Sequence, residues 1–344
     1  MDIFDFLKMF SPDRGCYGLS LGSSNITIAR SGKGVLVDEP SVIACETYSD
    51  RIVAFGSSAK AMIGRVPDTV TTSYPVQRGV VSDYRHLIYM LRDYIGRVKR
   101  SYFESDMIAA VPSSASVVER RAVIDALKAC GARKAILLEN AVAAALGCGL
   151  DIFDPKGQMI IDIGGGKTEI AVLSCGGVVS LSCPEVCGIQ MDRDIVSYVR
   201  KNYNILIGIS TAEYIKHKLG TVCAPKRRAF LDLGGRDLMS GLPVNFVLSN
   251  EDVYKALRDS AAAVMDSVSA MIEKLPPELT QDIVKGRICL CGGCASISGW
   301  SELLMDELCI DTYIPDNPSH AVALGAAGAK QTAERLSKKR TAKR

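Results

Sequence analysis

The chain has 344 residues, of which 48% are hydrophobic, and this length is sufficient for two domains with a substantial core. Its net charge of +3 is unevenly distributed: residues 330–344 carry seven Lys or Arg against one Glu, so the remainder is at −3, which argues against a nucleic-acid-binding protein. No apolar run reaches the roughly 18–20 residues that cross a bilayer, and no basic segment precedes an apolar one as in a secretory signal.

The first eleven residues predict an amphipathic helix that ends at Ser11-Pro12. Such a helix either packs on the core or lies in a membrane interface, and the second interpretation is favoured by its aromatic content. The proposed membrane-facing residues are Phe4, Phe6, Leu7 and Phe10. The basic tail, residues 334–344, either adds attraction to anionic lipid, at about 1 kcal/mol per Lys or Arg, or is a disordered end.

Two stretches, residues 17–30 and 159–173, have the same pattern. Each is an apolar strand with one polar position, then Gly, a loop of small residues and a second strand. A turn of small residues lets backbone N–H groups approach an oxyanion closely. The pattern therefore predicts duplicated halves that close on one phosphate chain. The copies differ at the polar strand position, which is Ser20 in the first and Asp162 in the second.

Strands and helices alternate along the rest of the chain. The expected strands are a pair over 34–46, then 52–55, 107–111, 134–138 and 288–290, with a β region over 223–248. The expected helices are 57–63, 83–100, 116–130, 141–150, 192–203, 210–219 and 250–275. This alternation predicts an α/β fold in which helices cover the sheets.

Three glycine-containing segments are candidates for a nucleotide site: residues 22–25, 162–168 and 291–295. The third follows an apolar strand, where paired glycines suit a flat ring or sugar lying against bare backbone. One such motif is usually a structural turn, whereas three of them, two with the same pattern, indicate a nucleotide site.

The twelve cysteines are scattered and predict reduced, mostly buried thiols of a cytoplasmic protein, as at Cys45, Cys130, Cys148 and Cys175. The cluster Cys289-x-Cys291-x-x-Cys294 offers three thiols that could bind a metal. It has no fourth ligand nearby, because the three histidines are distant in sequence, so packing is the favoured interpretation.

The order of these motifs resembles the actin-like ATPase superfamily and, within it, the MreB family of bacterial cell-shape proteins. The match spans about residues 17–330 and includes segments 34–41, 119–123, 143–150, 160–172, 211–216, 235–243 and 276–279. It implies two duplicated ribonuclease-H-like lobes around a nucleotide cleft. We expect lobe I at 12–147 plus 318–333 and lobe II at 148–317. Lobe II would contain a variable β subdomain at about 183–250, and residues 1–11 and 334–344 would flank the body.

The resemblance also implies ATP or ADP in the cleft, with phosphate contacts at Ser23, Ser24, Asn25, Gly164, Gly165, Gly166 and Lys167. Glu213 and Lys216 would border the ribose and adenine, and Gly292, Gly293, Cys294 and Ala295 would underlie the base. Asp162 would hold Mg²⁺ through water. The implied partners are further copies of the chain, membrane lipid and the wall-synthesis machinery, at the cytoplasmic face of the cell membrane. Tyr102 and Phe103 are a second membrane-loop candidate.

The chain departs from the family pattern around the phosphates. Ser20 replaces a carboxylate, and Lys167 replaces a small hydroxyl. In Glu139-Asn140, the amide of Asn140 stands where the family has the Glu that orients the attacking water. An amide cannot accept a proton near neutral pH, and losing a base costs about 3–5 kcal/mol of barrier lowering. We therefore predict that nucleotide is held while hydrolysis is weak or lost.

Two alternatives remain open at this point. The first is an active ATPase in which Asp162 places the metal and Glu139 or Asn140 positions water. The second is a regulatory paralogue that does not hydrolyse ATP and co-assembles with a hydrolysing MreB.

Overall fold

The computed structural model describes Lys8, residues 16–98 and residues 105–341, with side chains as far as residue 335. The predicted membrane-facing residues Phe4, Phe6, Leu7 and Phe10 lie outside the described residues, as do Tyr102 and Phe103, so both assignments stay predictions. In the part of the chain that is described, no helix combines the length and apolar character needed to cross a bilayer.

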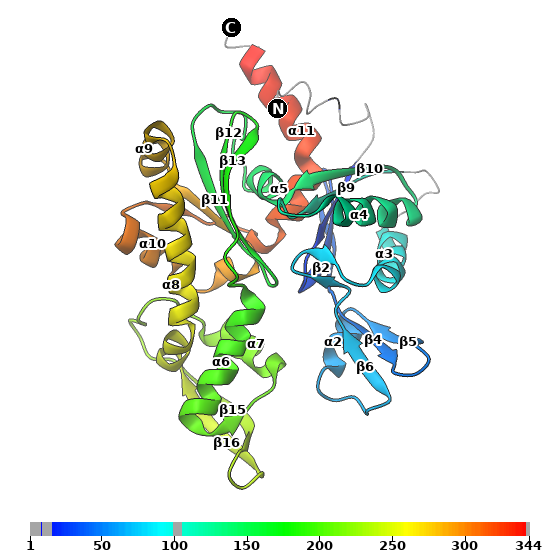
Figure 1. Cartoon of the computed structure of the whole chain (residues 1–344), viewed down its shortest axis with the longest axis vertical. Coiled ribbons are helices and arrows are strands. Elements are labelled where there is room, and N and C mark those ends of the chain that lie inside the picture. Colours follow the sequence, from blue (N-terminus) through cyan, green and yellow to red (C-terminus); the bar gives the residue numbers. More distant parts are fainter. Residues whose placement is uncertain (1–7, 9–15, 99–104, 342–344) are drawn as a thin grey trace.

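Two five-stranded sheets form the centre of the fold (Figure 1). The first has the order β10-β9-β1-β2-β3, from β1 (Cys16–Leu21), β2 (Asn25–Arg30), β3 (Gly34–Pro40), β9 (Ser105–Val111) and β10 (Ala132–Glu139). The second has the order β13-β12-β11-β17-β18, from β11 (Gln158–Ile163), β12 (Thr168–Ser174), β13 (Gly177–Ser182), β17 (Ile288–Cys291) and β18 (Thr312–Tyr313).

The two sheets have the same topology. In each, the first three strands form an antiparallel meander and the last two are added in parallel beside the first strand. The two hairpins found in the sequence are the β1–β2 and β11–β12 pairs at the centres of these sheets. The predicted α/β fold with duplicated halves is therefore confirmed.

Helices cover both sheets. On the first sheet these are α3 (Tyr84–Val98) and α4 (Val117–Ala129). The second sheet shares a hydrophobic cluster with α6 (Gly188–Tyr203), α7 (Ile209–Leu219), α8 (Asn250–Lys274), α9 (Pro277–Lys285) and α10 (Trp300–Leu308). We call each large sheet, with the elements packed on it, a lobe.

Two Ala-rich helices, α5 (Asn140–Gly147) and α11 (Ala321–Thr341), lie between the sheets and share one hydrophobic cluster with strands of both. Figure 1 shows α11 rising from this junction toward the top of the view. As a helix, α11 continues through residues 334–341, over most of the segment expected to form a basic tail.

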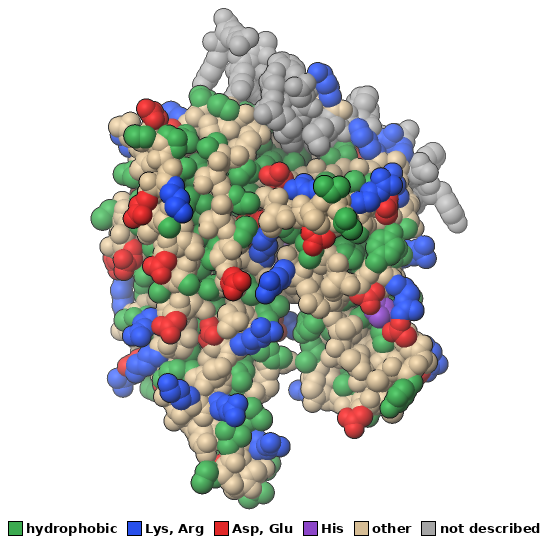
Figure 2. Space-filling model, viewed as in Figure 1, with side chains coloured by type: hydrophobic (Ala, Val, Ile, Leu, Met, Phe, Trp, Pro, Cys, Tyr) green, Lys and Arg blue, Asp and Glu red, His purple; other side chains and the backbone are tan. Residues whose placement is uncertain are grey.

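Each half carries a smaller part that we call an arm (Figure 1). The first arm holds the sheet β5-β4-β6, with β4 (Ile43–Glu46), β5 (Ile52–Phe55), α2 (Ser57–Met62) and β6 (Val70–Ser73). The second arm holds α6, α7 and the sheet β14 (Ile205–Leu206), β15 (Phe230–Asp237) and β16 (Pro243–Ser249). The short hairpin β7 (Val76–Gln77) and β8 (Val80–Val81) follows the first arm. Figure 2 shows a hollow between the two arms.

Two expectations differ from the structure. The strand pair over 34–46 does not form, because the chain leaves the first sheet at Pro40 and β4 joins the small sheet. Cys175 is exposed, because it occupies the β12–β13 hairpin turn with φ of 51°. Two short 3-10 helices complete the described elements: η1 (Gly293–Ser296) follows β17, and η2 (Pro318–His320) precedes α11.

Candidate functional site

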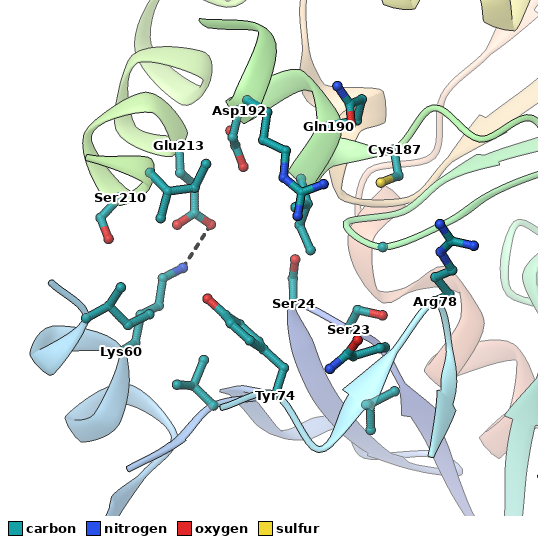
Figure 3. Close-up of a pocket in the computed structure, with 18 of the residues that line it drawn as sticks. Ser23, Ser24, Lys60, Tyr74, Arg78, Cys187, Gln190, Asp192, Ser210 and Glu213 are labelled. Carbon is teal, nitrogen blue, oxygen red and sulfur yellow. Dashed lines mark hydrogen bonds and ion pairs between the residues drawn. The ribbon is translucent and has the colours of Figure 1, made fainter. Parts of the chain in front are cut away.

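A cavity of about 580 Å³ lies between the two arms, beside the turns of the central hairpins (Figure 3). Four of the predicted nucleotide contacts line it, namely Ser23, Ser24, Gly166 and Glu213. The other lining residues include Lys60, Tyr74, Arg78, Cys187, Asp192 and Arg193. The structure thus brings the first two glycine segments to one cavity.

The two hairpin turns meet at their glycines. A Cβ on Gly165 would lie 2.0 Å from Ser24 Oγ, and one on Gly166 would lie 2.2 Å from Ser23 Oγ. Real Cβ atoms do not approach other atoms so closely, so only Gly at these positions allows the turns of the two lobes to touch. Glycine backbone of the second turn and the small serines of the first turn therefore border the cavity, which suits the close approach of an oxyanion.

Cationic side chains also border the cavity. Gly79 N–H donates to Ser23 Oγ at 3.1 Å, which holds the β7–β8 turn, with Arg78 at φ 51°, against the first phosphate turn. Arg193 lines the same cavity from α6. Within the described residues, neither guanidinium forms an ion pair or a side-chain hydrogen bond, so both remain available to phosphate oxygens. The glycine motifs did not indicate Arg193, which is an ordinary helix residue in the sequence.

Glu213 forms an ion pair across the cavity. Lys60 Nζ, from α2 of the first arm, lies 2.9 Å from Glu213 Oε1 on α7 of the second arm (dashed line in Figure 3). The predicted neighbour Lys216 lies behind the cavity wall, where its Nζ is 2.7 Å from Asp192 Oδ1 and donates to the Gly188 carbonyl at 2.7 Å. Burial raises the pKa of Asp192 to about 6, although Lys216 opposes this shift.

Lys167 does not extend freely toward the phosphate turns. Its ammonium donates to Ser114 Oγ of the first lobe at 2.8 Å and lies 2.9 Å from Glu169 Oε1. Glu169 is only 2% exposed and also accepts a hydrogen bond from Ser113 N–H at 3.1 Å. Lys167 and Glu169 together therefore bridge the two lobes. Glu169 was missed in the sequence, where its one signal is a charged residue inside the apolar strand β12.

Asp162 and Glu169 pair directly across β11 and β12. Burial, reinforced by Glu169 and opposed by Lys167, raises the pKa of Asp162 to about 7. Gly292, at φ 90°, allows this placement, since a Cβ there would lie 2.4 Å from Asp162 Oδ1. Glu169 Oε2 is buried and has no hydrogen-bond partner among the described residues. Two adjacent carboxylates with an unpartnered oxygen fit the oxygen ligands that a hydrated Mg²⁺ prefers.

This carboxylate pair gives a prediction for the nucleotide-free protein. Because the folded-state pKa of Asp162 is raised, the folded state binds more protons than the unfolded state between about pH 4 and 7, and stability falls as pH rises through that window. The D162N variant should lose this contribution. The free energy of unfolding of D162N minus that of the wild type should therefore increase by up to about 1.4 kcal/mol for each unit by which the pH rises within this window. Urea denaturation at a series of pH values measures the difference. A constant difference from pH 4 to 8 would contradict the assignment.

Glu139 and Asn140 lie where β10 ends and α5 begins. Parallel pairing of β10 with β9 aligns Glu139 with Val111, so both residues share the sheet edge that leads to Ser113. Ser113 in turn contacts Glu169. Neither Glu139 nor Asn140 is among the residues that line the cavity.

The other residues predicted to contact the nucleotide do not line the cavity. Asn25 Nδ2 donates to Asp38 Oδ1 at 2.9 Å. The third glycine segment, including Gly292, Gly293 and Ala295, lies outside the cavity lining. The Cys294 thiol is buried beside the Gly164 carbonyl, with Sγ to O at 4.0 Å, and burial raises its pKa to about 11. Cys289 and Cys291 are buried as well, consistent with packing.

Comparison with known proteins identifies a family for this chain. A family model described as MreB/Mbl protein matches residues 15–338. The cell shape-determining protein Mbl of Bacillus cereus is 35% identical over 333 residues, covering 96% of this chain and 99% of that protein. The cell shape-determining protein MreB of Escherichia coli is 36% identical over 333 residues and 94% of each chain.

Among solved structures, MreB 5 of Spiroplasma citri bound to AMPPNP superposes with a TM-score of 0.89 at 32% identity, covering 96% of this chain and 99% of that one. The MamK double helical filament, at 19% identity and a TM-score of 0.77, shares the fold, over 94% of this chain and 99% of its own. The chain has the actin-like fold predicted from its motifs, and it belongs to the MreB/Mbl family.

Proposed function

We propose that this chain is a filament-forming cytoskeletal protein of the cell-shape class that binds ATP or ADP between its two lobes. The observation that carries the proposal is the contact of the two glycine turns at Ser23–Gly166 and Ser24–Gly165 beside the 580 Å³ cavity. The names of the relatives support the cell-shape role. Similar structures bound to AMPPNP and to ADP support the nucleotide.

Hydrolysis is proposed to be weak or lost. Ser20 replaces a carboxylate on β1, and Asn140 offers an amide at the start of α5. The charge of Lys167 is already balanced by Glu169, so this lysine helps to join the lobes more than it neutralises phosphate. ATP would then act as a structural ligand, since a ligand that contacts both lobes stabilises the conformation in which they are closed.

The adjacent buried carboxylates of Asp162 and Glu169 favour the alternative of an active ATPase. Burial raises the pKa of Asp162 to about 7, which is in the range where a general base operates near neutral pH. In that case Asp162 would take the proton of the attacking water or hold a hydrated Mg²⁺, and Glu139 or Asn140 would orient the water.

The proposal extends to the domain division, the assembly and the cellular location of the protein. The lobes would divide at 12–147 with 318–333 and at 148–317, and copies of the chain would assemble into filaments. The filaments would lie at the cytoplasmic face of the membrane through residues 3–10, in contact with the wall-synthesis machinery. A hydrolysing MreB paralogue is a further assembly partner. Sedimentation of the protein alone and with such a relative separates self-assembly from co-assembly.

Calorimetric titration with ATP, with and without Mg²⁺, tests the proposal. We expect saturable binding of one ATP per chain. The G166A variant should bind at least about 10-fold more weakly, because its Cβ would keep the two turns apart at Ser23. G177A is the matched control, since a Cβ at that position in the second sheet meets nothing within 4 Å, and its affinity should equal that of the wild type. The absence of any purine nucleotide binding by folded wild-type protein would overturn the proposal.

A further inference from the structure

Three side chains from separate segments of the first lobe converge beside the first arm, away from the nucleotide cavity. We propose that Cys45, Asp50 and His86 form a binding site for a single zinc ion. Cys45 lies on β4, Asp50 in the turn that follows it, and His86 in the first turn of α3. Within the described residues they are the one group of three such side chains whose ligand atoms all lie within 4.8 Å of one another.

The separations between the ligand atoms match a zinc site. Cys45 Sγ is 3.4 Å from His86 Nε2, and Nε2 is 3.4 Å from Asp50 Oδ1. Tetrahedral zinc with bonds of about 2.3 Å to sulfur and about 2.0 Å to nitrogen and oxygen requires separations of about 3.5 Å and 3.3 Å. Two of the three separations therefore match tetrahedral zinc, and the third, between Cys45 and Asp50, lies within 4.8 Å.

Neighbouring groups hold the ligands in place. Asp83 accepts a hydrogen bond from the backbone N–H of His86 at 3.0 Å, and its other oxygen lies 2.7 Å from His86 Nδ1 without the alignment of a hydrogen bond. Because the Asp83 carboxylate occupies the Nδ1 side of the ring, Nε2 is the nitrogen that faces Cys45 and Asp50. Arg85 pairs with Oδ2 of Asp50 and leaves Oδ1 for the ion.

A simpler interpretation is an imidazolium ion between two carboxylates. It explains Asp50 and Asp83, but it assigns no role to the buried Cys45 thiol beside Nε2. Zinc accounts for all three ligands. On binding, the S–H bond of Cys45 breaks, its proton passes to solvent and the thiolate bonds to the metal. Asp50 is exposed, so the ion has an entry path and water can fill the fourth position.

The position of the site indicates what zinc would do. Cys45 and Asp50 belong to the first arm, whereas His86 belongs to α3, which covers the first large sheet. An ion held by all three would fix the arm to the body of its lobe. The inference is independent of nucleotide binding.

Zinc binding is tested on reduced, metal-free full chain by competition with a chromophoric chelator. We expect one zinc per wild-type chain. C45A and H86Q should lose at least about 100-fold in affinity, more than the 10–100-fold typical of losing a neighbouring support residue. D50N should also weaken binding, and Asn tolerates the left-handed backbone at φ 56°. C175S, which removes an exposed thiol outside the cluster, should bind as the wild type does.

Cobalt and thermal unfolding give independent readouts. Co²⁺ bound to the wild type should show a thiolate charge-transfer band that C45A lacks. At equal zinc concentration, the melting temperature of the wild type should rise more than that of folded D50N, which binds zinc more weakly. If the wild type binds no zinc at micromolar concentration, or if C45A, H86Q and D50N bind it as tightly as C175S does, the proposal is wrong.

Discussion

Replacing Asn140 by Glu is expected to raise the rate of phosphate release from ATP by about 10²–10⁴-fold, the usual contribution of a positioned general base. Asn140 begins α5 at the end of β10, on the sheet edge that leads through Ser113 to Glu169. A carboxylate there can accept the proton of a water that the amide can only hold. Release is measured under single-turnover conditions with saturating ATP and Mg²⁺.

The matched control is N140Q, which has the same length as the Glu variant but accepts no proton, and it should release phosphate at the wild-type rate. E139Q addresses the neighbouring carboxylate and should also have no effect. If N140E leaves a high wild-type rate unchanged, the site is already competent, and the active-ATPase alternative with Asp162 as base becomes the better account.

Periodicity predicted the helices and strands well, because the apolar faces it detects are the faces that pack. The helix predicted at residues 116–130 is α4, with Ser116 as its cap, and the expected strand 52–55 is β5. Periodicity could not show that β3 and β4 belong to different sheets, because each segment looks like a strand in the sequence. Only the structure shows where the chain leaves the first sheet, at Pro40, just before Ser41 N–H donates to the Ser24 carbonyl.

The site was predicted less completely, since residue type does not determine where a long side chain ends. The glycine turns were found because close backbone approach requires Gly, and Gly165 and Gly166 do contact the opposite turn. Lys167 was expected to face phosphate, but its position depends on Glu169 and on Ser114 in the other lobe. The ligands of the proposed zinc site, Cys45 and His86, are 41 positions apart in a spacing that matches no motif.

Replacing Gly325 by Ala is expected to destabilise the protein by about 3 kcal/mol, at the upper end of the usual cost of overpacking. α11 crosses α5 with the two backbones in contact, and a Cβ on Gly325 would lie 1.8 Å from the Ala143 carbonyl oxygen. The Ala143 carbonyl oxygen belongs to the backbone and cannot rotate away as a flexible side chain would, so the two helices must separate. Because these helices join the two large sheets, the loss should appear in urea denaturation of the whole chain.

Gly328 provides the matched control on the same helix. A Cβ there would meet only Thr332 Oγ1, at 3.9 Å, so G328A should gain the ordinary preference of Ala over Gly, about 0.5–1 kcal/mol. Both variants receive the same helix-propensity benefit, and the difference between them isolates the steric effect at the α5–α11 crossing. Equal stabilities for G325A and G328A would show that the helices can separate without cost. In that case the crossing would not be the rigid junction that fixes Asn140, at the start of α5, relative to the phosphate turns.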